Sequence, residues 1–234
     1  MIKIDNLLIT NFVNAIRGMR NPLESWHKSD SYHCDNNCEQ CRLYEQFCWA
    51  LGDKPYILGN NDYKLAMTLV KAGTDHAKFL RQIFVSMDIT APLYWWKEMD
   101  TYKVGTTTNS TSTMHKLGTR LLQEEDFSWD NEEGEFEDST FRQDYLLELN
   151  RMIYRYQEYK AKGENEKAKN LWRKIVQDLP SSYNQMRTWT GNYAVLRNIY
   201  HARKNHKLKE WRDFCKFLEE FPYAEFIIEK REVV

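Results

Sequence analysis

Hydrophobic and polar residues alternate in two segments of the chain, and each alternation predicts a β-strand. Residues 2–10 carry isoleucine and leucine in imperfect alternation with polar residues. In residues 82–90, every second side chain from Ile83 to Ile89 is apolar, while polar side chains such as Asp88 lie between them. A period of two is typical of a strand with one buried face. We therefore expect two strands of one sheet in the first half of the chain.

Helical spacing of apolar residues dominates the rest of the chain, above all after residue 140. The expected helices span residues 11–19, 63–72, 93–103, 140–162, 165–178, 182–203 and 206–220. Glycine or proline follows several of them, as is typical of helix ends. Two segments look irregular instead. They are 20–59, which contains most of the cysteines, and 124–138, in which nine of fifteen residues are acidic.

This order of elements predicts an α+β fold, in which a small antiparallel sheet packs with helices and the C-terminal half is helical. The chain has 234 residues, which fits a single domain spanning 1–234. Within that domain we expect 20–59 and 124–138 to be insertions. The acidic insertion is most simply a solvated loop.

Composition and charge exclude several classes of protein. The chain has 33 Lys and Arg against 34 Asp and Glu, and 14% of its residues are aromatic. This balance excludes a generally basic nucleic-acid binder, and the aromatic content excludes a disordered chain. Mean hydropathy is −0.73, and no apolar run approaches the roughly 20 residues of a spanning helix. Since the first residues also lack a signal-peptide pattern, we expect a cytoplasmic protein with neither nucleic-acid nor membrane partners.

Two polar residues fall on an apolar face of the expected helix 182–203. At 100° per residue, Arg203 lies ~20° from Asn192 on the helical wheel, and Leu196 and Ile199 lie close to both. A buried guanidinium needs an anion or several acceptors, because leaving it without them costs several kcal/mol. Either Arg203 forms an internal salt bridge, or it marks a site for a phosphate or another anionic ligand.

The cysteines cluster strongly, with four of the five between positions 34 and 48. His33, Cys34, Cys38 and Cys41 have spacings suited to a structural zinc ion. Three of these cysteines also match the Cys-x3-Cys-x2-Cys spacing of radical S-adenosylmethionine enzymes, which hold a [4Fe–4S] cluster, but this chain lacks the pattern of their βα barrel. Reduced thiols without a metal are the third interpretation.

The C-terminal part of the chain combines a Leu-Pro pair, a Trp-Thr-x-Asn segment and an arginine closely followed by histidine. The residues are Leu179-Pro180, Trp189-Thr190-Gly191-Asn192, Asn198, Arg203, His206 and Glu210. This arrangement resembles the C-terminal signature of the flavin-dependent thymidylate synthases, including a helix that carries Trp-Thr-x-Asn. Upstream, His76, the strand 83–89 and Ala91-Pro92 resemble the same family, and the resemblance covers roughly residues 60–228.

The sequence departs from this family at its defining motif, Arg-His-Arg-x-x-Ser-x-Asn-Glu-x-Ser-x-Arg. The Arg-His-Arg position reads Thr101-Tyr102-Lys103, and the first serine falls on Thr106. The Asn-Glu pair aligns with Thr108-Asn109 or with Asn109-Ser110. The arginine expected before Leu-Pro is also missing, and the gap between Arg203 and His206 is one residue shorter than in the family.

The resemblance implies a homotetramer that binds FAD and converts dUMP, or a related pyrimidine deoxynucleotide, with methylenetetrahydrofolate and NADPH as co-substrates. The residues that match flavin-binding positions are His76, Asn192, Asn198, Arg203 and His206. Those expected on the nucleotide side are Lys97, Tyr102, Lys103, Thr106, Asn109, Ser110 and Arg203. No catalytic residue is assigned. The alternative is a degenerate member that binds a nucleotide or a protein partner without turnover, which the missing arginines favour.

An aromatic run follows the second expected strand. Tyr94, Trp95 and Trp96 begin the expected helix 93–103. Aromatic side chains there either stack on a flavin or a base, or belong to the hydrophobic core.

Overall fold

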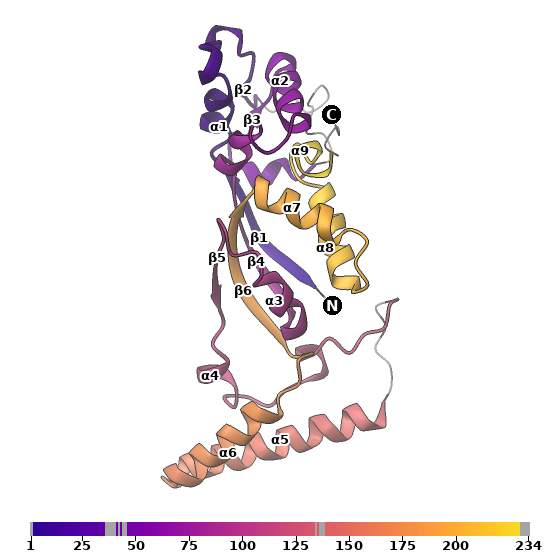
Figure 1. Cartoon of the computed structure of the whole chain (residues 1–234). Helices are drawn as coiled ribbons and strands as arrows, with labels where there is room; N and C mark the ends of the chain where they lie inside the picture. The colour runs from indigo at the N-terminus through magenta and orange to yellow at the C-terminus, as the bar shows by residue number, and fades with distance from the viewer. Residues whose placement is uncertain are drawn as a thin grey trace. The chain divides into compact units, whose positions relative to one another are not determined.

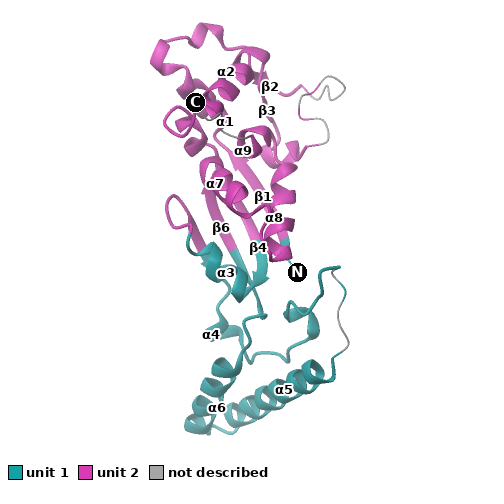
Figure 2. Cartoon of the chain, turned by 45° about the vertical axis from the view of Figure 1, so that its right-hand side comes forward, with its two compact units in different colours: residues 1–3, 89–101, 109–187 teal, residues 4–88, 102–108, 188–234 magenta. Residues whose placement is uncertain are grey.

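The computed structural model describes residues 2–35, 41, 43, 46–133, 135 and 139–229 (Figure 1). These residues form an α+β protein with a small antiparallel sheet, as the sequence predicts. The chain divides into two compact units, which Figure 2 colours separately. Unit 1 contains residues 1–3, 89–101 and 109–187, and unit 2 contains residues 4–88, 102–108 and 188–234. The single domain with two insertions stays a prediction.

The strands form two sheets. They are β1 (Lys3–Thr10), β2 (Tyr32–His33), β3 (Tyr56–Ile57), β4 (Phe84–Pro92), β5 (Thr107–Ser110) and β6 (Asn184–Asn192). The larger sheet has the order β1-β4-β6-β5, so its central pair joins strands that are far apart in sequence. Side chains bond across this pair from Thr188 to Asp88 and from Thr190 to Ser86, as expected for antiparallel neighbours. β2 and β3 pair antiparallel in a small second sheet.

Helices make up most of the remaining structure. In unit 1 they are α3 (Leu93–Met99), α4 (Thr113–Lys116), η6 (Glu124–Asp126), α5 (Thr140–Ala161) and α6 (Asn165–Asp178). In unit 2 they are α1 (Phe12–Met19), η1 (Asn21–Leu23), η2 (Trp26–Lys28), η4 (Cys48–Leu51), α2 (Asn60–Lys71), η5 (Lys78–Gln82), α7 (Tyr193–Arg203), α8 (Lys209–Glu219) and α9 (Glu225–Ile228). No helix among the described residues is long and apolar enough to cross a membrane.

The alternation in β4 is confirmed by burial. Val85, Met87 and Ile89 are fully buried, whereas Ser86 and Asp88 are only half-buried. Burial of one face stabilises the strand because each large aliphatic side chain removed from water contributes about 1.5–3 kcal/mol. The strand continues through Pro92, which also precedes the first residue of α3.

The helix expected over 182–203 is wrong in its first half, because residues 184–192 form β6. Trp189 is buried between the exposed Thr188 and Thr190, which is the period of a strand. Branched and aromatic side chains also favour extended backbone. Asn192 is extended, with φ −149°, and only after it does α7 begin. The angular comparison of Asn192 with Arg203 therefore does not apply, since only Arg203 lies on the helix.

The segment after β4 also differs from expectation. α3 ends at Met99 and so does not include Tyr102. Trp95 and Trp96 are fully buried, which confirms the core interpretation for both. The hydroxyl-rich segment that follows forms the exposed strand β5, which lies at the end of the strand order.

Unit 1 contains a helical hairpin with its own hydrophobic cluster. The helices α5 and α6 lie where the sequence predicts them and pack against each other (Figure 2). The acidic segment contributes to this cluster, because Phe127 and Trp129 are buried and stack with ring centroids 4.3 Å apart. The described part of 124–138 is therefore anchored by two aromatic rings between its acidic residues.

Candidate functional site

The five residues expected to bind flavin all belong to unit 2, but they lie in three different places. Asn192 and Asn198 line one cavity, whereas His76 lines another. Arg203 and His206 both lie beside Trp211.

The first cavity lies at the first turns of α7, and we call it the α7 cavity. Its volume is about 480 Å³. The residues that line it come from three segments of unit 2: Gly73, Thr74, Ala77, Leu80 and Arg81; Val104 and Gly105; and Asn192, Ala194, Val195, Arg197 and Asn198. The family signature thus contributes its two asparagines to one wall of this cavity.

Local contacts fix the position of Asn192. Its side-chain oxygen accepts a hydrogen bond from the backbone N–H of Val195 at 3.1 Å, which caps α7. Gly105 lies against its amide, because a Cβ at that position would be 3.1 Å from Asn192 Nδ2. Gly105 also has φ +75°, a conformation that glycine adopts readily. The turn before β5 can therefore approach the asparagine closely.

The electrostatics of the α7 cavity favour an anion. None of the described residues that line it is acidic, and two are arginines, Arg81 and Arg197. Arg197 is 5% exposed, and its Nη1 donates to the carbonyl of Phe226 at 3.0 Å. The N-terminus of an eleven-residue helix adds a partial positive charge at the same place. A phosphate or pyrophosphate group matches this combination.

Arg203 packs between two aromatic rings at the end of α7. Its guanidinium carbon lies 4.8 Å from the centre of the Trp211 ring and 5.6 Å from that of Tyr102. Its Nε donates to the Tyr102 hydroxyl at 2.9 Å. Cation–π contacts of this kind offset part of the cost of burying the charge. The ring of His206 lies on Trp211 as well, with centroids 6.3 Å apart, so these four side chains form one cluster.

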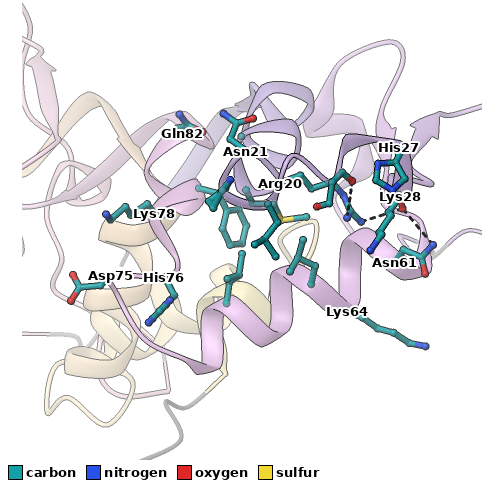
Figure 3. A pocket seen from close by; sticks show the side chains of 18 residues that line it. Arg20, Asn21, His27, Lys28, Asn61, Lys64, Asp75, His76, Lys78 and Gln82 are labelled. Carbon is teal, nitrogen blue, oxygen red and sulfur yellow. Dashed lines mark hydrogen bonds between the residues drawn. The ribbon is translucent and has the colours of Figure 1, made fainter.

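The second cavity lies between α1 and α2, and we call it the α2 cavity (Figure 3). Its volume is about 840 Å³, and it is lined by residues from α1, η1, η2, α2 and the segment 73–82. That segment lines both cavities: His76 and Lys78 line the α2 cavity, whereas Thr74 and Arg81 line the α7 cavity. The structure therefore does not bring His76 into one cavity with the two asparagines.

The residues expected on the nucleotide side are divided between the units. In unit 2, the hydroxyl of Thr106 donates to the carbonyl of Tyr102 at 2.6 Å, and Lys103 is exposed. In unit 1, Lys97 is exposed on α3, and Asn109 and Ser110 are exposed on β5. Their role in nucleotide binding stays a prediction.

Unit 1 holds a further cation that the sequence pattern did not single out. The Arg187 guanidinium lies 4.3 Å from the Trp96 ring centre, and its Nη1 is 2.8 Å from a carboxylate oxygen of Asp100. Its Nε donates to Gln185 at 3.0 Å. No sequence pattern singles out these arginines, because the residues around each of them come from distant segments of the chain. The arginines are Arg81, Arg187 and Arg197.

The expected zinc ligands cannot be compared as a set, because Cys38 lies outside the described residues. The ring of His33 lies 3.3 Å from the carbonyl of Lys54 and packs on Tyr56. Among the residues that the structure describes, no three His, Cys, Asp or Glu side chains form a group that could hold a metal. The zinc ion stays a prediction.

No protein-family model and no curated protein sequence matches the chain. Its fold is similar to that of solved structures. The crystal structure of thymidylate synthase X (ThyX) from Helicobacter pylori with FAD and dUMP has a TM-score of 0.64 and 18% identity, and the match covers 98% of each chain. The crystal structure of flavin-dependent thymidylate synthase ThyX from Helicobacter pylori, complexed with FAD and dUMP, has a TM-score of 0.63 and 16% identity. This match covers 97% of this chain and 100% of that chain. These likenesses establish a shared fold.

Proposed function

We propose that this chain is a flavoenzyme that binds FAD in the α7 cavity and modifies a pyrimidine deoxynucleotide. One observation carries the proposal: Asn192 and Asn198, which the family signature singles out, line one cavity whose described lining residues include no acid. The fold around that cavity is similar, over almost the whole chain, to proteins whose structures contain FAD and dUMP.

The donor groups of the α7 cavity suit parts of FAD. The amides of Asn192 and Asn198 can hydrogen-bond the polar edge of the flavin ring or its ribityl chain. Arg81 and the N-terminus of α7 supply positive charge for the pyrophosphate. FAD would supply the redox chemistry, and the residues of this chain would bind it, orient it and neutralise its charge.

For the reaction itself, we propose dUMP or a related nucleotide as substrate, with methylenetetrahydrofolate and NADPH as co-substrates and a homotetramer as the assembly. Lys97 and Lys103 would supply positive charge for the nucleotide phosphate. Thr106, Asn109 and Ser110 would supply hydrogen bonds. Lysine holds phosphate as a point charge rather than as a planar fork, so we expect weaker nucleotide binding than an arginine pair would give.

Flavin loading tests the proposal directly. The purified chain, incubated with FAD and passed through gel filtration, should retain the visible absorption of flavin. Asn198→Ala and Arg81→Ala should each weaken FAD binding about tenfold, the usual effect of losing one hydrogen bond of about 1.4 kcal/mol. Arg173→Ala, at an exposed position on α6, is the matched control. A chain that takes up no FAD would overturn the proposal.

A second candidate is a nucleotide-binding protein without turnover. The observation that favours it is the Tyr102 hydroxyl, which accepts from Arg203 at 2.9 Å and so uses one donor of the arginine expected near the nucleotide. Formation of dTMP from dUMP, methylenetetrahydrofolate and NADPH separates the two candidates. Binding of FAD and dUMP with no dTMP formed would support the binding protein.

A further inference from the structure

The α2 cavity has the size and the distribution of polar groups of a small-molecule site. Its volume of about 840 Å³ lies within the usual range for ligand pockets. Figure 3 shows Asp75, His76 and Lys78 at one end and His27 and Lys28 at the other, with hydrocarbon side chains between the two ends. The apolar residues that line the cavity include Met19, Leu65, Leu69 and Phe79. The cavity therefore fits an elongated ligand with an apolar body and polar groups at both ends.

Positive charge dominates the lining. Lys28, Lys64 and Lys78 line the cavity, against a single aspartate, Asp75. None of the three lysines forms a salt bridge with another described residue. In Figure 3 Lys64 points away from the cavity, whereas Lys28 and Lys78 mark its two ends. The acidic residue lies at the end opposite Lys28 (Figure 3). An anionic group of the ligand is therefore best accommodated at the Lys28 end, and a hydrogen-bond donor at the Asp75 end.

A buried ion pair holds the Lys28 end in place. Arg20 Nε lies 2.6 Å from Asp62 Oδ1, and the two side chains are 4% and 0% exposed. The remaining nitrogens of Arg20 donate to the carbonyls of Ser25 and Lys28 at 3.4 and 3.3 Å. Arg20 thus binds the backbone of the segment that carries His27 and Lys28. Because Asp62 balances the charge of Arg20, Lys28 supplies the net positive charge at this end of the cavity.

The carboxylate of this pair has a further set of donors. Ser29 and Ser31 donate their hydroxyls to Asp62 Oδ2 at 2.6 and 2.5 Å. Burial raises the pKa of Asp62, but the hydrogen bonds from the serines and Arg20 outweigh it, so that the pKa lies below its usual value. Asp62 is therefore ionised at neutral pH and keeps its ion pair with Arg20.

We propose that the α2 cavity is a second ligand site, which binds a phosphorylated nucleoside with its phosphates at the His27 and Lys28 end and its base at the Asp75 and His76 end. The apolar middle takes the faces of the base and sugar. The carboxylate of Asp75 accepts from an exocyclic amino group, as on adenine. The site is separate from the α7 cavity, and the proposal does not depend on FAD binding there.

Titration calorimetry of the full chain with ADP tests this site. ADP should bind with one-to-one stoichiometry, and adenosine and inorganic phosphate should each bind at least about tenfold more weakly, because each supplies only part of the interaction. Lys28→Ala should weaken ADP binding about tenfold, since it removes a charged hydrogen-bond donor. Leu65→Trp, which adds a bulky ring to the apolar lining, should abolish ADP binding. Thermal melting checks that each variant remains folded.

Two controls locate the bound ADP. Lys54→Ala changes an exposed lysine of unit 2 that does not line the cavity, and it should leave ADP affinity within about twofold of the wild type. Arg81→Ala should likewise leave it unchanged. Loss of ADP binding in Arg81→Ala but not in Lys28→Ala would place ADP in the α7 cavity and overturn the proposal. Equal affinity for ADP and adenosine, or binding of decanoate but not ADP, would overturn it as well.

Discussion

The α7 cavity and the α2 cavity are lined by the same segment, residues 73–82, but different chemistry holds each of them together. The α7 cavity depends on backbone geometry, with Asn192 as a helix cap and Gly105 packed against it. The α2 cavity depends on side-chain charge, with Arg20 and Asp62 as a buried pair. A helix cap such as Asn192 and a turn glycine such as Gly105 can each be recognised from a short stretch of sequence. The ion pair between Arg20 and Asp62 cannot, because it joins distant positions. This explains why the family signature indicates residues of the first cavity but only His76 of the second.

Asp62→Ala should have the largest effect, because it leaves Arg20 buried without its carboxylate. We expect the free energy of unfolding to fall by about 3–5 kcal/mol, as for other buried pairs that lose one partner. Urea denaturation measures this change. Asp53→Ala, at an exposed position in the same unit, should cost less than about 0.5 kcal/mol. Equal effects of the two substitutions would mean that charge does not hold the α2 cavity together.

Gly105→Ala tests the backbone side of the comparison. The positive φ should lower the free energy of unfolding by about 1–2 kcal/mol. The new methyl group, 3.1 Å from Asn192 Nδ2, should also lower FAD affinity several-fold. Gly163→Ala is a matched control, because Gly163 has φ +73° but nothing within 4 Å of the added Cβ. The Gly163→Ala variant should lose as much free energy of unfolding as Gly105→Ala but keep the FAD affinity of the wild type. Loss of affinity in both variants would contradict a specific contact with Asn192.

Tyr102→Phe tests whether the contact of Arg203, at the C-terminal end of α7, with Tyr102 affects ligand binding. Removal of the hydroxyl ends the hydrogen bond from Arg203 but keeps the aromatic ring, so the free energy of unfolding should fall by about 0.5–1.5 kcal/mol. Tyr154→Phe on α5, where the tyrosine is 60% exposed, should change stability by less than about 0.5 kcal/mol. Chemical denaturation compares them. If dUMP affinity rises in Tyr102→Phe, the tyrosine competes with the nucleotide for Arg203.

The pH dependence of stability should give the smallest effect. Hydrogen bonds lower the pKa of Asp62 in the folded chain, so its contribution is present above the unfolded pKa of about 3.9. That contribution is lost as pH falls through the lower folded value. Asp62→Asn should therefore flatten the loss of stability below about pH 4. Denaturation at a series of pH values measures the slope, and identical slopes in wild type and variant would contradict this assignment.

Periodicity predicted those elements in which one period extends over many residues. The alternation of β4 and the helices α5 and α6 were correctly predicted, because buried and exposed positions repeat regularly in each. The segment 182–203 combines a strand and a helix without a break, and its apolar spacing alone predicts a single helix. Gly191 marks the strand instead, because a Cβ there would lie 2.2 Å from the Trp189 ring.

The candidate site was predictable only where short motifs define it. Asn192 and Asn198 line one cavity and His76 lines another, and their part in flavin binding stays a prediction. His76 lies in the turn before η5, and no periodic pattern fixes which side of a turn a residue faces. Arg20 and Asp62 are 42 positions apart, and no local pattern connects them.

The shared segment 73–82 has a thermodynamic consequence. A ligand that alters the conformation of this segment from one cavity changes the affinity of the other cavity, and linkage requires the effect to be reciprocal. Typical coupling energies of about 1–3 kcal/mol correspond to changes of about 5- to 150-fold in each direction. For such a ligand, the dissociation constant of either cavity is defined only together with the occupancy of its neighbour.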